Sequence, residues 1–432
     1  MRLLLAFLFV NNVVAKLAVM IIGSRCENSK LLIGKQKLKV MEKFKKTAEV
    51  FDIINDFPND RGMWTFVPAI LKIRSLNKKF DQYLLADESS DINLENFNIS
   101  ETKNVFGGYA LQDKEPTIIH HFGFNLPNDF KYPLLSAGIL ISSDVVDRIH
   151  DKQNTLSLPS FSIDPQHEFA SFLYANLQIK LTHLPGLFCM QSEPSCLVTR
   201  RESLLTSTIP DEDIQVKIKT YKGNHDDRIS ILKKTWTAKL KNVEYCSDSE
   251  DVDIPTIDLG LGNTERGHCA KTWGIMKRFD GSKWLLIADD DTLMSYDRLK
   301  QLLSMYDPEE RVIIGERYGY GFGYGGNRGY DYPTGGSGMI FTKSAVDSIL
   351  SVCPSCSSPD DPDDMMLGMC AQIANVSIVH SRSLHQARPE DYSEDYLKSK
   401  TPISFHKFTD TDPVKNYEDY LKTDKISKKL EL

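Results

Sequence analysis

The sequence lacks three features that would assign it at once to a broad class of proteins. After its first residues it has no apolar run of about 18 residues, the length that spans a membrane. It has no basic region that would bind nucleic acid, because 52 Lys and Arg are outnumbered by 59 Asp and Glu. Its eight cysteines include a single C-x-x-C unit, whereas a structural zinc site needs paired units. These absences argue against a transmembrane helix, a nucleic-acid partner and structural zinc.

The two ends of the chain read as targeting signals. "MRLLLAFLFVNNVVAK" has a basic second residue, a short apolar run and small residues before Lys16. This layout predicts a secretory signal peptide, residues 1–15, cleaved after Ala15, although a buried first strand is the alternative. The tail, residues 426–432, ends in Lys429-Leu430-Glu431-Leu432, which resembles a retrieval signal read by a receptor. Together the two ends predict retention in the lumen of the endoplasmic reticulum.

The cysteines and two sequons fit that compartment. In an oxidising lumen we expect structural disulfides, with a connectivity that the spacing leaves open. For the "CPSC" unit, Cys353 to Cys356, redox activity is the alternative to a structural role. Asn98 and Asn375 each begin an Asn-x-Ser acceptor sequence and are predicted glycosylation sites.

An internal repeat divides the chain. Three blocks of the first half recur in the second half in the same order, with nearly the same spacing. The paired blocks are 83–90 with 284–292, 132–149 with 332–349, and 163–175 with 360–374. We therefore predict two copies of one domain, residues 16–200 and 212–425, joined by a linker at 201–211.

The two copies differ at their acidic residues. Ser89 replaces the third aspartate of the "DDD" in the second copy, and Gln166-His167 replace the acids of its "PDD". The first copy is thus predicted to be non-catalytic and to bind no catalytic metal. We expect it to hold the acceptor protein, with simple structural support of its partner as the alternative.

The second copy alternates strand and helix patterns. Segments 214–221, 243–248 and 283–291 have the character of strands, while 228–240 and 269–279 have helical spacing or composition. Such alternation predicts an α/β fold with mostly parallel, mixed sheets flanked by helices. Ligands of these sheets bind beyond the carboxyl ends of the strands. The aspartates of "WLLIADDDTLM" stand at that end.

This acidic cluster has the composition of a cation site. Asp289 and Asp291, separated by one residue, can direct both carboxylates to one hard cation such as Mn²⁺ or Mg²⁺. Downstream, Gly335 and Gly336 begin "GGSG", where the missing Cβ atoms let the backbone approach a ligand closely.

These motifs carry a family resemblance. The strand followed by "DDD", then "TGGSG", "PDDMMLG" and a following histidine resemble the Fringe-like inverting β-1,3-glycosyltransferases, whose fold is of the GT-A type. The "HQARPEDY", "DYL" and "PISFHK" segments and the C-terminal tetrapeptide resemble a branch that transfers glucose onto O-linked fucose of thrombospondin type 1 repeats. The second copy would then be the catalytic GT-A domain and the first a degenerate one.

The resemblance implies roles for individual residues. Asp291, with Asp289, and His385 would bind Mn²⁺ or Mg²⁺; His406 is the alternative to His385. Asp364 would be the general base, with Asp363 as the fallback. Without the resemblance, Asp363 and Asp364 read as an acidic pair at a helix N-terminus.

Donor contacts and substrates are implied in the same way. The donor-binding residues, besides Gly335 and Gly336, would be Asp290, Arg228, Ser247, Asp248 and Lys271. The alternative interpretation of the charged residues among them is that they are ordinary surface charges. The donor would be UDP-glucose and the acceptor an O-fucosylated thrombospondin type 1 repeat. A galactosyl- or N-acetylglucosaminyl-transferase of the family and a non-catalytic lumenal lectin or chaperone are the alternatives.

Overall fold

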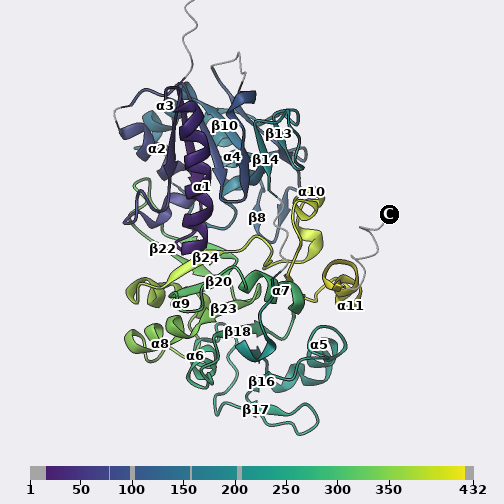
Figure 1. Cartoon of the computed structure of the whole chain (residues 1–432). Helices are drawn as coiled ribbons and strands as arrows, with labels where there is room; N and C mark the ends of the chain where they lie inside the picture. The colour runs from purple at the N-terminus through teal and green to yellow at the C-terminus, as the bar shows by residue number, and fades with distance from the viewer. Residues whose placement is uncertain (1–15, 77, 98–102, 156–157, 202–206, 424–432) are drawn as a thin grey trace, which may run out of the picture.

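The computed structural model describes residues 16–76, 78–97, 103–155, 158–201 and 207–423. Two α/β domains follow one another along the chain, the first coloured purple to teal and the second mainly green in Figure 1. The predicted signal peptide, the sequon at Asn98 and the C-terminal tetrapeptide lie outside the described residues. Within the described segments, no helix is both long and apolar enough to cross a bilayer.

The first domain is built on a six-stranded mixed sheet. Its strands, in spatial order, are β12 (Thr182–His183), β5 (Phe106–Gly108), β10 (Ile139–Ser142), β3 (Gln82–Asp87), β1 (Leu17–Ile22) and β2 (Ala48–Asp52). β2, β1 and β3 are parallel, and β10 is antiparallel to both of its neighbours. The central strands are buried on both faces, which explains runs such as "LAVMII".

The second domain has a seven-stranded sheet. Its order is β17 (Thr256–Asp258), β16 (Val243–Ser247), β15 (Ile214–Lys219), β18 (Trp284–Asp289), β23 (Met339–Thr342), β20 (Val312–Gly315) and β24 (Ser377–His380). Only β23 runs antiparallel to its neighbours.

The internal repeat is visible in the topology and in the register. The first sheet, read from β2 to β12, has the order and strand directions of the second sheet read from β16 to β24. Ile22 pairs with Asp87 at the carboxyl end of β1, as Lys219 pairs with Asp289 at the carboxyl end of β15. The two sheets are therefore two copies of one topology.

Helices cover both sheets. The first domain has α1 (Glu27–Phe44), α2 (Val67–Ser75), α3 (Ser143–Lys152) and α4 (Pro165–Leu177). The second has α5 (Ser230–Lys234), α6 (Cys269–Lys277), α7 (Tyr296–Leu303), α8 (Lys343–Val352), α9 (Asp363–Ile373), α10 (Glu394–Lys398) and α11 (Pro413–Asn416). The helix expected over 228–240 is much shorter, because the backbone leaves helical geometry at Thr235. Trp236 is nonetheless buried, and its Nε1 donates to the Thr292 carbonyl at 2.9 Å.

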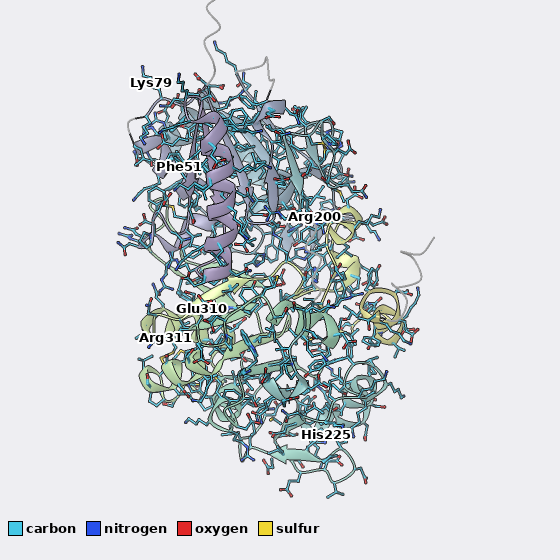
Figure 2. All side chains as sticks on the ribbon, in the orientation of Figure 1. Phe51, Lys79, Arg200, His225, Glu310 and Arg311 are labelled. Carbon is cyan, nitrogen blue, oxygen red and sulfur yellow. A yellow bond between two sulfur atoms is a disulfide. The ribbon has the colours of Figure 1, made fainter. Side chains whose placement is uncertain are left out.

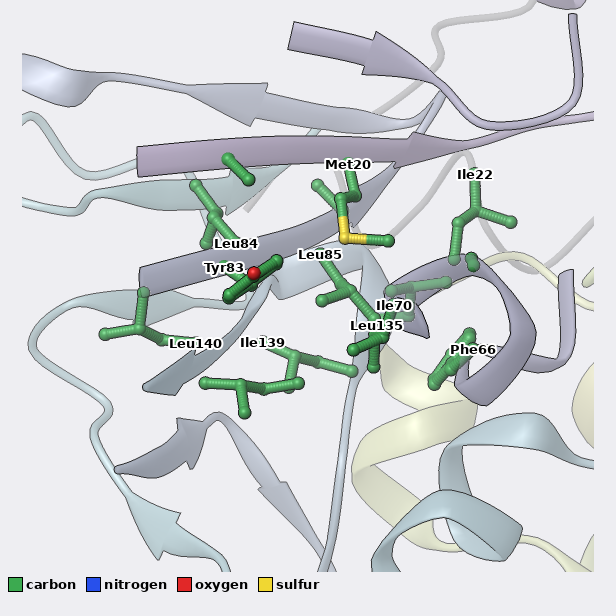
Figure 3. Close-up of a cluster of buried hydrophobic side chains, with 14 of the residues drawn as sticks. Met20, Ile22, Phe66, Ile70, Tyr83, Leu84, Leu85, Leu135, Ile139 and Leu140 are labelled. Atoms are coloured by element: carbon green, nitrogen blue, oxygen red, sulfur yellow. The ribbon is translucent and has the colours of Figure 1, made fainter. Parts of the chain in front are cut away.

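Branched and aromatic side chains fill the core of the first domain. Figure 3 shows Met20 of β1, Leu85 of β3 and Ile139 of β10 on one face of the sheet, with Phe66 and Ile70 beside them. All five are fully buried. Burial of such side chains stabilises the fold by about 1.5–3 kcal/mol each.

The two domains are joined by backbone hydrogen bonds. β11 (Phe161–Ser162) of the first domain pairs with β21 (Arg317–Tyr320) of the second, which pairs in turn with β22 (Tyr330–Pro333). At the junction, Glu310 accepts a hydrogen bond from the Glu27 amide at 2.8 Å; Figure 2 shows Glu310 between the two halves. α10 lies beside β8 (His121–Phe122) in Figure 1. One three-stranded antiparallel sheet thus crosses the domain boundary.

Six cysteines form disulfides. The pairs are Cys189–Cys196, Cys269–Cys356 and Cys353–Cys370, while Cys26 and Cys246 are free and buried. The two cysteines of "CPSC" therefore each pair elsewhere, which confirms the structural interpretation over a redox unit. Asn375 is exposed in the turn between α9 and β24, where a glycan can be attached.

Candidate active site

The three aspartates follow β18 and meet a histidine from the C-terminal segment. β19 (Thr292–Met294) pairs antiparallel with β25 (Ser404–His406), and Thr292 is opposite His406. This pairing places His406 Nε2 3.0 Å from Asp291 Oδ1 and 3.7 Å from Asp289 Oδ2. The site thus combines residues more than a hundred positions apart.

Arg228 contacts the second and third aspartates of the cluster, and further side-chain donors hold the second. Arg228 Nη1 lies 2.7 Å from Asp290 Oδ1 and 2.9 Å from Asp291 Oδ2. Asp290 also accepts hydrogen bonds from Thr220 and Asn224, at 2.7 and 2.9 Å. Asp290 therefore anchors the loop after β15, and its carboxylate does not face the same partner as Asp289. These contacts offset the repulsion between adjacent carboxylates.

Lys219 is a member of the site that sequence reasoning missed. It ends β15, next to β18, and its Nζ lies 3.0 Å from Asp289 Oδ1 and 2.7 Å from Asp363 Oδ2. Burial by itself lowers the pKa of this ammonium, but the two carboxylates raise it above its ordinary value. The sequence held a signal for this role, because "IQVKIK" places two lysines among apolar residues of a predicted strand. The structure shows that this strand is buried throughout.

Asp289, Asp291 and His406 fit a divalent cation. One ligand atom from each lies within 4.8 Å of the others. His406 Nδ1 lies 3.1 Å from the Gln386 carbonyl, so an N–H there leaves Nε2 free to coordinate. Although burial lowers the pKa of His406, Asp291 raises it overall, so the carboxylate favours the protonated ring. A cation bound at Nε2 would compete with a proton on that nitrogen.

The structure places His385 in the core, and His406 is the histidine that it groups with the two aspartates. Its side chain is fully buried, and Nδ1 donates to the Ser404 carbonyl at 2.8 Å. Its ring stacks on Phe405, with centroids 4.6 Å apart, and Tyr392 packs against its edge. Because side chains alternate along a strand, Phe405 faces the core while the next residue, His406, faces the aspartates. His385 supports the strand that carries the alternative ligand.

Gly336 makes room for that histidine. A Cβ on Gly336 would lie 2.3 Å from His406 Nδ1, closer than atoms can approach. The Gly336 carbonyl accepts a hydrogen bond from Thr292 at 2.8 Å, which fixes the loop against β19. Gly335 borders the site as well, since its Cβ would lie 3.9 Å from Asp289 and 4.0 Å from Lys219.

The two acids of "PDD" occupy different environments. Asp363 is buried and held by Lys219 and by the Thr272 hydroxyl, which donates to Oδ2 at 2.6 Å. Burial raises its pKa, but Lys219 lowers it overall. Asp364 is partly exposed, and burial together with the charge of Asp363 raises its pKa to about 7. Asp364 can therefore exchange a proton near neutral pH, and Asp363 cannot.

The remaining expected donor contacts surround the loop after β15. Asp248 accepts a hydrogen bond from the Lys222 amide at 2.8 Å, and Ser247 Oγ lies 2.8 Å from His225 Nε2. Lys271 donates to the Thr220 carbonyl at 2.6 Å. These residues shape the loop that Arg228 and Asp290 also hold, while direct contact with a donor remains a prediction for each.

The corresponding region of the first domain lacks the acids but contains a histidine cluster. His121 Nδ1 lies 2.6 Å from Asp113, and Nε2 lies 3.1 Å from Asp164. Burial lowers the pKa of His121, but these two carboxylates raise it to about 9, so His121 is charged. His167 stacks on His121 with centroids 4.0 Å apart and planes 8° apart. Stacked parallel rings cannot both direct a nitrogen lone pair, which lies in the ring plane, at one cation.

Comparison with known proteins identifies the family. A sequence model described as Fringe-like matches residues 209–429, more than half of the chain and the whole second sheet. The chain is 38% identical over 415 residues to "Beta-1,3-glucosyltransferase" of Mus musculus, covering 92% of this chain and 83% of that protein. The chain belongs to the Fringe-like glycosyltransferase family.

Other relatives of this Fringe-like glycosyltransferase include the "Beta-1,3-glucosyltransferase" of Homo sapiens, 39% identical over 416 residues, with 92% of this chain and 82% of that protein covered. A "Glycoprotein-N-acetylgalactosamine 3-beta-galactosyltransferase 1" of Xenopus laevis is 26% identical over 161 residues, covering 35% and 42% of the two chains. The predicted family and the glycosyltransferase activity are thus confirmed, as is the α/β fold class. The residue roles remain predictions.

Proposed function

We propose that this chain transfers glucose from UDP-glucose, with inversion, to form a β-1,3 linkage on O-linked fucose of thrombospondin type 1 repeats. The observation that carries the proposal is identity of 38–39% over 92% of the chain to proteins named β-1,3-glucosyltransferase. The intact acidic cluster of the second domain is consistent with it. The acceptor rests on the resemblance of the "HQARPEDY" and "PISFHK" segments.

The residues of the site suggest how the transfer proceeds. Asp364 would accept the proton of the acceptor hydroxyl, because its raised pKa suits a general base near neutral pH. The hydroxyl oxygen would then attack the anomeric carbon while UDP leaves from the opposite face. This single displacement inverts the configuration and requires no covalent intermediate.

The chain offers a binding set for the leaving diphosphate. A divalent cation held by Asp289, Asp291 and His406 would neutralise charge that develops on the diphosphate oxygens. Two carboxylates and one imidazole suit Mn²⁺, with Mg²⁺ as the other choice. Arg228 and the Gly335–Gly336 backbone border the same space, so they would orient the nucleotide.

We place the reaction in the lumen of the endoplasmic reticulum. Three disulfides among the described residues suit an oxidising compartment. The assignment to the endoplasmic reticulum rests on the sequences of the two ends of the chain. Deletion of residues 429–432 should release active enzyme into the medium, and unchanged retention of the truncated protein would contradict the assignment.

Transfer assays with several donors test the proposed function. The full chain would be incubated with Mn²⁺, an O-fucosylated thrombospondin repeat and UDP-glucose, UDP-galactose or UDP-N-acetylglucosamine. We expect product from UDP-glucose at a kcat/KM at least about tenfold above the other donors. Preference for another donor would favour the galactosyl- or N-acetylglucosaminyl-transferase alternative. Binding of the repeat without transfer from any donor would favour the lectin or chaperone.

A further inference from the structure

A second ligand-sized cavity lies between the two domains. Its volume is about 560 Å³, within the usual range for small-molecule sites. On the first-domain side it is lined by residues at the carboxyl ends of the strands, including Gly23 after β1 and Asp87 to Ser89 at the end of β3. Ser136 and the start of α4 complete this wall.

This location matches the candidate donor site of the second domain. In the shared topology and register, Asp87 corresponds to Asp289, and Ser89 to Asp291. Ligands of α/β sheets bind at this edge. The first domain has therefore lost the acids at Ser89, Gln166 and His167 but has kept a cavity at the place where the second domain would bind a nucleotide.

An arginine from the second domain supplies a positive charge at this edge of the first domain's sheet. Arg382, which follows β24, forms an ion pair with Asp87. In the second domain the corresponding Asp289 pairs with Lys219, whose counterpart in the first domain is the apolar Ile22. The charge of Asp87 is thus balanced by the protein itself, so this cavity needs no cation for that purpose.

Three other nitrogens around the cavity lack a hydrogen-bond partner among the described residues, although the Arg317 guanidinium lies 4.4 Å from the Trp64 ring centroid and Lys400 Nζ lies 3.3 Å from that of Tyr396. Arg317 Nε, His120 Nδ1 and Lys400 Nζ are all inaccessible to solvent and make no hydrogen bond within the described structure. The side chains of Arg317 and His120 are each more than nine-tenths buried. A buried donor without a partner costs about 1–3 kcal/mol. Arg317 Nε and Lys400 Nζ can donate, and His120 Nδ1 donates in the tautomer that carries its proton there, so the cavity suits a ligand that accepts hydrogen bonds.

The charge of the lining favours an anion. Six basic side chains and four acidic ones line the cavity. The basic residues are Arg200, Arg201, Arg298, Arg317, Arg382 and Lys400. Of the four acids, Asp87 is paired with Arg382, and Asp164 with the charged His121. Burial raises the pKa of Glu316 to about 7 and that of Glu88 above its ordinary value, and it lowers the pKa of Lys400 well below its ordinary value. These shifts favour the neutral forms of all three groups, whereas the pKa of Arg317, lowered by burial to about 10, leaves its guanidinium charged.

We propose that this interdomain cavity binds a nucleoside diphosphate, free or as a sugar ester, without a divalent cation. The diphosphate would face Arg317 and Lys400. Aromatic rings of Trp64, Phe66 and Tyr392 also line the cavity and offer apolar surfaces for the base. Because both domains contribute contacts, the ligand would stabilise their junction.

Calorimetric titration with UDP in excess EDTA tests this proposal on the full-length chain. We expect one equivalent of UDP to bind to the wild type and to Asp291→Asn, in which the candidate metal site is disabled. Lys400→Met should weaken this binding at least about tenfold, because a hydrogen-bond donor to the diphosphate is lost. Lys398→Met is the matched control, since Lys398 is exposed two residues away and should leave binding unchanged.

The two sites provide an internal check on folding. With Mn²⁺, a second equivalent of UDP should bind to the wild type and to Lys400→Met, but not to Asp291→Asn. If Lys400→Met loses both equivalents, His120→Gln replaces it with the same expectation. No binding of UDP to the wild type in EDTA, or equal binding by Lys400→Met, would overturn the proposal. Inorganic phosphate that binds as tightly as UDP would also overturn it, because a nucleotide would not be recognised.

Discussion

Replacement of Asp364 by asparagine tests the proposed general base. The change keeps the size of the side chain but removes the group that accepts the proton. Positioned general bases contribute about 10²–10⁴-fold to rate, which corresponds to about 2.7–5.5 kcal/mol of activation free energy. We therefore expect Asp364→Asn to lower kcat by that factor, with little change in the melting temperature, because Asp364 is partly exposed and forms no ion pair within the described structure.

The pH profile supplies an independent test of the same residue. Burial and the neighbouring charge of Asp363 raise the pKa of Asp364 to about 7, and only its deprotonated form can accept a proton. Activity should therefore be full above this pKa and fall about tenfold per pH unit below it. Assays at saturating Mn²⁺ at every pH exclude loss of metal through protonation of His406.

Asp363→Asn is the matched control. It removes a carboxylate that Lys219 and Thr272 hold, so it should lower thermal stability. The acid limb of the pH profile should persist but move to lower pH, because the charge of Asp363 no longer raises the pKa of Asp364. In Asp364→Asn the residual activity should lose that limb. A variant Asp364→Asn with more than about a tenth of wild-type kcat would refute the assignment. So would a wild-type profile that stays flat between pH 5.5 and 8.

Further predictions concern the cation site and its supports. His406→Ala should weaken Mn²⁺ binding by at least about 10–100-fold in titration calorimetry, whereas His385→Phe should leave it unchanged; the reverse result would restore His385 as the ligand. Gly336→Ala should also weaken Mn²⁺ binding, since its Cβ would lie 2.3 Å from the His406 ring, and unaltered affinity would contradict this packing. Lys219→Met should lower the free energy of unfolding in EDTA by about 3–5 kcal/mol, because Asp363 and Asp289 lose the ammonium group with which both are paired. Chemical denaturation measures this loss, and unchanged stability would show that the ion pairs are dispensable.

The sequence predicted the repeated α/β architecture well, because hydrophobic pattern and repetition are local signals. "QYLLAD" and "WLLIAD" are buried strands at equivalent places in two sheets of one topology. The short helix at Ser230–Lys234 departed from the expected 228–240. There Trp236 is buried against β19 instead of continuing the helical face, so a tertiary contact outweighed the local spacing.

The candidate site was predictable where its residues are adjacent in sequence. Asp289 and Asp291 were found from the acidic cluster, and both lie at the end of β18 as expected. The choice between His385 and His406 was not predictable, because it depends on which face of β25 points to the aspartates. Lys219 was missed for a similar reason, since its role depends on the pairing of β15 with β18.

The cavity between the domains had no signal in the sequence. It forms where Arg317 and Arg382 of the second domain cover the strand ends of the first. The sequence correctly placed Ser89 and Gln166 where acids stand in the second copy. It did not reveal that the side chains around them come from a different domain.

The configuration of the newly formed glycosidic bond tests the central claim most directly. The product made from UDP-glucose, in which glucose is α-linked, would be isolated on an O-fucosylated repeat or on a simple fucoside. Its anomeric one-bond carbon–hydrogen coupling would then be measured by NMR. The account predicts a β-1,3-linked glucose from the wild type and no product from Asp291→Asn. An α-linked product, or undiminished transfer by Asp291→Asn, would contradict it.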